Sequence, residues 1–255
     1  MGFRKYGHSV ACRRSHAQTC TRVVASDSST VYMGHRVPGA PSLIDFKSPE
    51  GRAMLMACLE SDAPGNKYLS LSEQFLTQSS PPSCGMATLA MVLNSLRVDP
   101  GRVWQQPWRW FTEEMLISCY PLEMGKIGIT MEHFGHIAEC NGAAVETVYG
   151  EEVTVNEFRQ VLRDVFESSD EKRIALAFDR QILGQTGTGH YSPVGAFNEN
   201  ADMILVLDVA RFKYPPYWVP VELMWRAMCT HDPDTQRSRG FFILTPPPST
   251  PENSA

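Results

Sequence analysis

The sequence contains no long apolar run, no excess of basic residues and no segment typical of a secretory signal. None of its apolar runs approaches the roughly 18 residues that a membrane-spanning helix needs, which predicts a soluble protein with no membrane partner. Lys and Arg number 23 against 28 Asp and Glu, and no basic stripe is interleaved with aromatic residues. The formal net charge of -5 therefore argues against a nucleic-acid surface.

The cysteines also lack the spacing of a disulfide framework. There are 7 of them, an odd number, widely scattered and with no C-x-x-C pair. This pattern is typical of free thiols in a reducing compartment, so we expect a cytoplasmic protein. A non-catalytic metal buffer rich in thiols would need its cysteines clustered, and it is a weaker interpretation for that reason.

Both ends of the chain have little structural pattern. Five basic residues precede the first acidic residue, Asp27, so an organelle-targeting segment is the alternative to a poorly ordered extension. A secretory signal needs an apolar core after its basic residues, and none follows here. We expect an N-terminal extension over residues 1–45, a catalytic domain over 46–245 and a disordered, proline-rich tail over 246–255.

Helical patterns dominate the first half of this domain and strand patterns the second. Helices are expected at residues 49–59, 84–96, 112–118, 131–140, 154–166 and 221–228. Strands are expected at residues 144–149, 174–178, 190–197, 203–209 and 241–244. The order predicts an α+β fold rather than repeated βαβ units. The aromatic run 104–111 is expected to be a packed connection, with the wall of a cleft as the alternative.

One cysteine lies at the start of the most strongly patterned helix. From Met86 to Leu96 the apolar residues recur at helical spacing, after two prolines that should hold the chain extended and a Ser83 N-cap. Cys84 therefore falls in the first turn, where unpaired N–H groups and the helix dipole stabilise a thiolate. The alternative is a buried structural cysteine, and its partners must decide between the two interpretations.

Two residues of the strand-rich half are candidate partners for this thiol. His190 follows Gly189 at the start of an expected strand, so the backbone can approach a ligand while the imidazole lies at the strand edge. The alternative is an ordinary surface or core histidine. Asp208 ends an apolar run, where a carboxylate needs a partner: an imidazole N–H that it orients, or Arg211 in a salt bridge.

Gln78 completes this set of candidate catalytic residues. It lies shortly before Cys84, where its side-chain amide and the Cys84 backbone N–H would hydrogen-bond a developing oxyanion. The chain order of cysteine, histidine and then an acid or amide is that of papain-like enzymes, although the C-G-[SA]-C-[WY] signature of the cathepsins is absent.

The runs that contain these residues resemble the catalytic domain of the phytochelatin synthase family over about residues 70–245. They are 81–88, 99–102, 107–111, 185–193 and 208–216. The resemblance implies a papain-like fold of a helical N-terminal lobe and an antiparallel-sheet C-terminal lobe, with the active site in the cleft between them. By motif it places the nucleophile on Cys84, the base on His190, the orienting acid on Asp208 and the oxyanion glutamine on Gln78.

The activity implied by the resemblance is an acyl transfer from glutathione. A γ-glutamylcysteine dipeptidyl transpeptidase would cleave glycine from glutathione through a cysteine thioester and pass γ-Glu-Cys to another glutathione or phytochelatin, in heavy-metal detoxification. The implied partners are these peptides, and a homodimer is one option for the assembly. The alternative is a glutathione hydrolase with little polymerisation, since the sequence shows no cysteine-rich C-terminal domain and resembles short, hydrolysis-biased members.

Substrate is expected to contact Gly189 and the segment that follows Asp208. Arg211, Lys213 and Tyr214 lie in that segment, and an Arg fork suits a carboxylate of the acceptor glutathione. The alternative for Arg211 is the salt bridge to Asp208.

The resemblance also implies a heavy-metal ion, Cd²⁺ or Zn²⁺, and no organic cofactor. Soft ions prefer thiolates, so the metal would enter as a glutathione complex or bind cysteines of the protein. Cys119 and Cys140 match family cysteine positions, and they are weak candidates because no tight ligand cluster is evident. His133 and His136 share a helical face with Cys140, which is more often an ordinary half-exposed face than a site.

Overall fold

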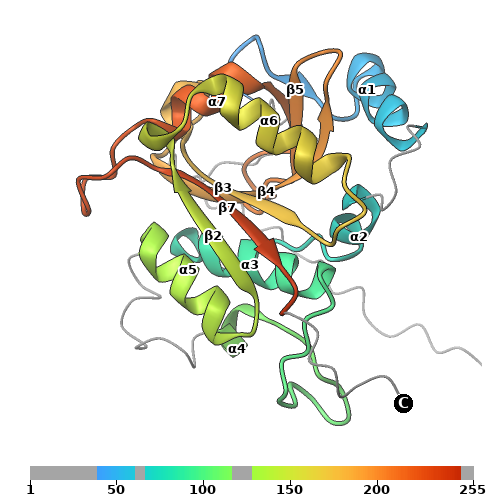
Figure 1. Ribbon diagram of the computed structural model, residues 1–255, viewed down its shortest axis with the longest axis vertical. Helices are drawn as coiled ribbons and strands as arrows, with labels where there is room; N and C mark the ends of the chain where they lie inside the picture. The colour runs from blue at the N-terminus through green and yellow to red at the C-terminus, as the bar shows by residue number, and fades with distance from the viewer. Residues whose placement is uncertain (1–38, 61–66, 117–127, 248–255) are drawn as a thin grey trace, which may run out of the picture. The chain divides into compact units, whose positions relative to one another are not determined.

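The computed structural model describes residues 39–60, 67–116 and 128–247. In these residues the strands form a seven-stranded sheet in the order β1-β6-β5-β4-β3-β7-β2, with every neighbouring pair antiparallel (Figure 1). The strands are β1 (Ile44–Asp45), β2 (Ala144–Tyr149), β3 (Arg173–Asp179), β4 (Gly189–Asn198), β5 (Met203–Val206), β6 (Tyr217–Pro220) and β7 (Gly240–Thr245). Among the helices of the described residues, none has the length and apolar character to cross a membrane.

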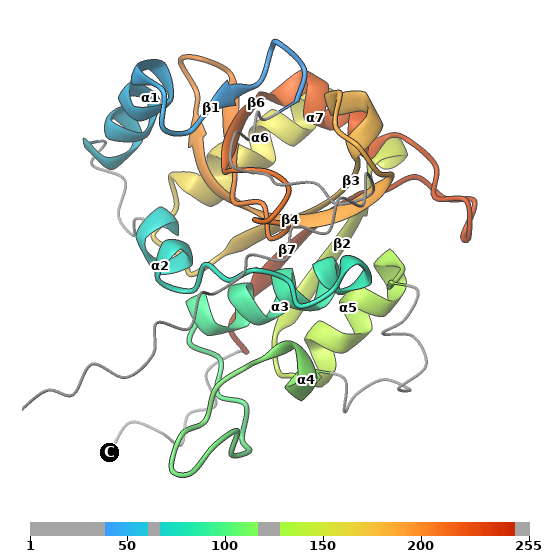
Figure 2. The same ribbon diagram turned by 180° about the vertical axis from the view of Figure 1, so that it is seen from behind.

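Helices cover both faces of this sheet (Figures 1 and 2). They are α1 (Pro49–Glu60), α2 (Lys67–Glu73), α3 (Cys84–Ser95), α4 (Glu113–Leu116), α5 (Met131–Cys140), α6 (Val155–Phe166) and α7 (Val221–Met228). Successive residues of β3 point to opposite faces, so Ile174 and Leu176 pack with α6 and α7 while Ala175 and Ala177 pack in the cluster of α3 and α5. The α+β prediction is confirmed.

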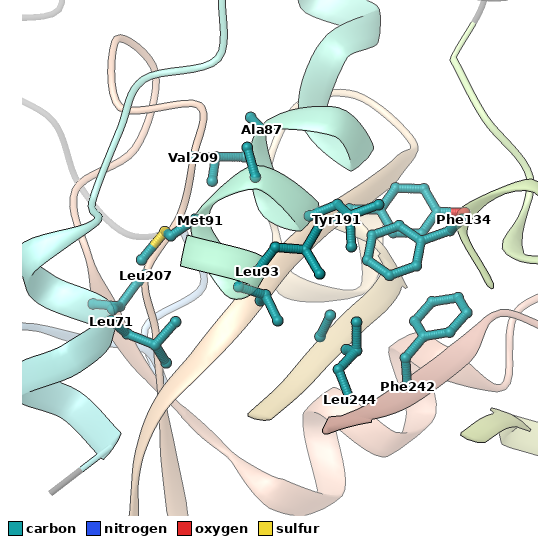
Figure 3. Close-up of a cluster of buried hydrophobic side chains, with 14 of the residues drawn as sticks. Leu71, Ala87, Met91, Leu93, Phe134, Tyr191, Leu207, Val209, Phe242 and Leu244 are labelled. Carbon is teal, nitrogen blue, oxygen red and sulfur yellow. The ribbon is translucent and has the colours of Figure 1, made fainter. Parts of the chain in front are cut away.

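Helix α3 is the most deeply buried helix of the fold. All of its residues except Asn94 are buried, and Figure 3 shows Met91 and Leu93 among side chains of the sheet and its connections, such as Leu207 and Leu244. Each fully buried Leu or Met contributes on the order of 1.5–3 kcal/mol. This packing holds the N-terminal end of α3, which carries Cys84, against the start of β4, the central strand of the sheet.

Several local signals in the sequence are confirmed. Thr154 and Glu157 form the expected capping box of α6, with the Thr154 side chain accepting the Glu157 N–H. Asn141 is the C-cap of α5, and Gly142 adopts a φ of 93°, which an L side chain rarely adopts. These signals are local hydrogen bonds and backbone conformations, so they can be read from a few residues.

Other expectations are wrong in detail. The two prolines before Cys84 belong to a 3-10 turn, Pro81–Ser83, rather than an extended segment, and Ser83 makes no side-chain capping bond. Strand β5 ends at Val206, before Asp208. The elements α2, β1 and β6 were not predicted. Strand β1 lies at the end of the expected N-terminal extension, most of which is outside the described residues, as is most of the expected tail.

The aromatic run is an exposed loop and not the packed connection that its composition predicts. The exposed fractions are 40% for Trp104, 67% for Trp108 and 42% for Trp110, whereas Phe111 is buried. The loop turns back on itself through an antiparallel bridge between Gln105 and Trp108. The run does not line the cleft described below, so the alternative of a cleft wall is not supported either.

Candidate active site

Cys84 is the first residue of α3, and its thiol lies against the start of β4. It hydrogen-bonds the His190 side chain and the Tyr191 backbone N–H. Burial raises the pKa of this thiol, but the hydrogen bond and positive charge of His190 oppose burial and hold the Cys84 pKa below its ordinary value. The local environment therefore favours a thiolate.

His190 contacts the thiol from the second residue of β4. Its Nε2 lies 3.1 Å from Asp208 Oδ1 and 2.9 Å from Ser192 Oγ, which leaves Nδ1 for the hydrogen bond to Cys84. Burial lowers the His190 pKa, whereas the charge of Asp208 raises it, and the net pKa lies above the ordinary value. An imidazolium at His190 and a thiolate at Cys84 would thus stabilise each other as an ion pair.

Asp208 is fully buried behind this imidazole and is surrounded by donors. Besides His190 Nε2, both terminal nitrogens of Arg180 donate to it at 2.9 Å, the Ala210 N–H donates at 2.9 Å, and the Tyr217 hydroxyl lies at 3.5 Å. Burial raises the pKa of this carboxyl, but the positive charges of His190 and Arg180 hold it well below its usual range. Asp208 is therefore an ionised, oriented acceptor, and its salt bridge is with Arg180 and not with Arg211.

Gln78 lies in the loop before Cys84 and is buried. Its backbone N–H donates to Val209 O at 2.9 Å, and its Nε2 donates to Ser80 O at 2.7 Å and Pro81 O at 3.0 Å. Its Oε1 is buried without a hydrogen-bond partner among the described residues. Both amide hydrogens are thus directed to carbonyls of the loop, and a bond to an oxyanion would replace one of these contacts. The role of Gln78 as an oxyanion donor stays a prediction.

A cleft of about 500 Å³ opens onto Cys84 and His190. The first turn of α5, the residues around Gly189 and the segment 232–239 form its other walls. A cleft of this size is in the usual range for a small-molecule or short-peptide site. The chemistry that the ion pair can perform is acyl transfer, because a thiolate is a strong nucleophile and the adjacent imidazolium can protonate a leaving amine.

Sequence reasoning missed one charged pair of this cleft. Arg239 is buried in its wall and donates to the carbonyl oxygens of Thr230 and His231, and its Nη2 lies 3.6 Å from Asp232 Oδ2. Its guanidinium lies beside Gly189, where an added Cβ would be 3.4 Å from Arg239 Nε. The Arg239-Gly240 pair at the start of the final strand is a signal of the same kind as Gly189-His190.

The predicted substrate residues lie in two places. Gly189 lines the cleft, whereas Arg211, Lys213 and Tyr214 are not among its lining residues. The Arg211 guanidinium lies over the Phe75 ring at 4.6 Å, Lys213 donates to the Thr186 carbonyl, and the Tyr214 hydroxyl accepts the Thr186 N–H at 2.7 Å. Their part in substrate binding stays a prediction.

The candidate metal ligands do not form a site in the described part of the chain. Cys140 is disulfide-bonded, so the expectation of free thiols is wrong at this position and its sulfur is not a thiolate ligand. Spacing alone could not reveal this bond, because tertiary structure decides which thiols meet. Cys58, Cys84 and Cys229 are not disulfide-bonded, and Cys119 lies outside the described residues. No three His, Cys, Asp or Glu residues are grouped as metal ligands within the described ranges.

Comparisons with known proteins point to one family. A family model described as phytochelatin synthase matches residues 35–241. The chain is 45% identical over 213 residues to glutathione gamma-glutamylcysteinyltransferase 2 of Arabidopsis thaliana. The aligned region covers 83% of this chain and 47% of the relative. It is 44% identical over 204 residues to the glutathione gamma-glutamylcysteinyltransferase of Schizosaccharomyces pombe. There the aligned region covers 79% of this chain and 48% of the relative. The chain thus spans about half the length of the curated relatives it matches.

Proposed function

Because this chain belongs to the phytochelatin synthase family, we propose that it is a γ-glutamylcysteine dipeptidyl transpeptidase that uses glutathione as acyl donor. The buried Cys84–His190 pair at the base of a cleft supports this proposal above all, because an ionised thiol beside an imidazolium is what the acyl transfer requires. The products would be free glycine and peptides longer by one γ-Glu-Cys unit.

The first half of the reaction forms an acyl-enzyme. The Cys84 thiolate attacks the carbonyl carbon of the Cys–Gly bond, and the negative charge moves to the carbonyl oxygen, within reach of the Cys84 backbone N–H. When this intermediate collapses, the C–N bond breaks and His190 gives its Nδ1 proton to the departing glycine amine. A γ-Glu-Cys thioester and a neutral imidazole remain.

The second half returns the enzyme to its starting state. The amine of a second glutathione attacks the thioester while His190 takes the proton that this amine loses. The new peptide bond forms, the S–C bond breaks, and the thiolate–imidazolium pair is restored. Water in place of the amine releases γ-Glu-Cys, so the acceptor decides between transfer and hydrolysis.

Arg239 and Asp232 suit the γ-glutamyl end of the donor. That end carries an α-carboxylate and an α-ammonium group on one carbon, so it presents both charges side by side. The buried Arg239 guanidinium would bind the carboxylate and Asp232 the ammonium group, both on the wall of the cleft that contains Cys84. This arrangement would orient the Cys–Gly bond toward the thiolate.

The heavy metal enters this scheme as part of the substrate. Soft ions such as Cd²⁺ bind the thiolates of two glutathione molecules, and such a complex would present both peptides together. The described residues give no support to a separate site on the protein, since Cys140 is in a disulfide and no ligand group is assembled. No step of the mechanism above passes through a metal bound by the chain.

The proposal is tested by incubating the protein with glutathione, with and without Cd²⁺, and analysing the products by mass spectrometry. We expect free glycine together with peptides longer by one or more γ-Glu-Cys units, and more of these peptides when Cd²⁺ is present. Free glycine with γ-Glu-Cys alone would identify a hydrolase. The absence of both products would contradict the proposal.

Arg239 and Arg211 are expected to affect different parts of the reaction, the first the binding of the donor and the second the transfer to the acceptor. Arg239→Met should raise the KM for glutathione about tenfold or more in both hydrolysis and transfer, because hydrogen bonds to charged groups contribute about 1.5–3 kcal/mol. Arg239→Lys keeps the charge and should raise the KM for glutathione less.

Arg211→Ala should lower transfer and leave hydrolysis unchanged if Arg211 binds the acceptor. An equal loss of both activities in Arg211→Ala would rule out that role.

A further inference from the structure

Arg180 is a buried charged group beside the active site that the mechanism does not use. It follows β3 directly, is buried, and donates through both terminal nitrogens to Asp208, each at 2.9 Å. It also donates to the Gln185 side chain, and its guanidinium lies 4.8 Å from the centre of the Tyr214 ring. These contacts fix its plane and place it against the same carboxylate that His190 contacts.

An acid in this position creates a difficulty that a neutral amide would not. A fully buried carboxylate beside His190 stabilises the imidazolium strongly, yet the imidazolium must give up its proton in every catalytic cycle. When the imidazole becomes neutral, the carboxylate would remain buried with no positive partner, which is costly. A permanent cation bound to the carboxylate removes this difficulty, because Asp208 then has a partner in both states of His190.

We propose that Arg180 is a positioning residue whose charge balances Asp208, so that a buried acid can orient His190 without trapping its proton. The bidentate geometry supports this role, since it occupies both carboxylate oxygens and leaves Oδ1 shared with His190 Nε2. Arg180 then acts through Asp208 and not on the substrate. This inference deepens the proposed function and rests on it for the proton transfer to glycine.

Several other charged or titratable groups lie around the Cys84–His190 and Arg180–Asp208 pairs, and the test leaves them unchanged. They are Arg239 beside Gly189, Lys213 beside Gly187, Asp232, and the phenols of Tyr191, Tyr214 and Tyr217. Only the Arg180–Asp208 pair is altered, and its net charge can be set without new contacts to the cleft, because neither residue lines it.

The wild type, two single variants and one double variant give the Arg180–Asp208 pair three different net charges. The pair is neutral in the wild type, negative in Arg180→Met, positive in Asp208→Asn and neutral again in the double variant Arg180→Met/Asp208→Asn. The double variant has the neutral amide orienter of the papain arrangement. It is the decisive chain, because replacing both partners of a buried pair is tolerated far better than removing one. Thermal unfolding of all four chains shows whether each is folded.

The first measurement needs no substrate. The rate at which iodoacetamide modifies Cys84 is followed against pH by mass spectrometry of the Cys84 peptide. We expect the rise in rate to move to higher pH in Arg180→Met, to lower pH in Asp208→Asn, and to return close to the wild-type position in the double variant. Shifts of both single variants in the same direction, or a double variant that stays with Arg180→Met, would overturn the proposal.

The second measurement is turnover of glutathione. Arg180→Met should lose activity, and the double variant should recover about tenfold or more relative to it, because the two residues are coupled and their losses are not additive. A double variant no more active than Arg180→Met would overturn the role of Arg180 and would indicate direct contact with substrate. If none of the chains used glutathione while Cys84 alkylation kept the expected order, the proposed function would fail and the charge balance would stand.

Discussion

Replacing Cys84 by Ala is expected to abolish both release of glycine from glutathione and formation of longer peptides. Without the sulfur no thioester can form, and the remaining donors of the site can only bind the substrate. The loss in kcat should be about 10⁴-fold or more, as for other enzymes that lose their nucleophile. Glycine release and peptide products from the same incubation measure it.

Cys229→Ala is the matched control for this prediction. The Cys229 thiol is free and partly buried, and it donates to the Gly150 carbonyl at 3.3 Å, outside the cleft lining. Burial raises its pKa, so it is not a nucleophile at neutral pH. The control should keep full activity. Undiminished turnover in Cys84→Ala, or equal losses in both variants, would show that the reaction does not pass through Cys84.

The thiol, the imidazole and the acid could be predicted from sequence because each stands at the boundary of a recognisable element. Cys84 opens a helix with a strong apolar pattern, His190 follows a glycine at the start of a strand, and Asp208 follows an apolar run. Boundaries of this kind place functional groups at the ends of buried elements, where groups from different elements can meet. The structure brings these three residues together.

The role of Arg180 could not be predicted because it depends on a partner that is distant in the sequence. Arg180 follows Asp179 in the sequence, which suggests a local surface pair, yet its partner is Asp208. An arginine is normally exposed, and nothing local indicates that Arg180 is buried. The expectation that Trp108 is packed is wrong in the opposite direction. The aromatic composition of its segment suggests burial, yet Trp108 lies in a loop that turns back on itself and is 67% exposed.

The dependence of turnover on pH is the second large effect that the structure predicts. With ordinary values, an imidazolium loses its proton near pH 6.5 and a thiol only near 8.5, so the active ion pair would be scarce at every pH. Here the Cys84 pKa is lowered and the His190 pKa is raised. A lower thiol pKa keeps the thiolate to lower pH, and a higher imidazole pKa keeps the imidazolium to higher pH. The plot of kcat/KM against pH should therefore be a broad bell that falls about tenfold per pH unit beyond each limb.

Two readouts separate the groups responsible for the two limbs. Alkylation of Cys84 needs only the thiolate, so its rate should show the acid limb and no decline at high pH, whereas turnover also needs the imidazolium and should show both limbs. Cys229 in the same chain is the internal control, since its raised pKa should delay its alkylation to higher pH. In His190→Ala the Cys84 limb should move up toward that of Cys229, because the hydrogen bond and charge that lower the Cys84 pKa are gone. If the Cys84 limb stayed in place in that variant, His190 would not be the group that ionises the thiol, and the mechanism would need another base.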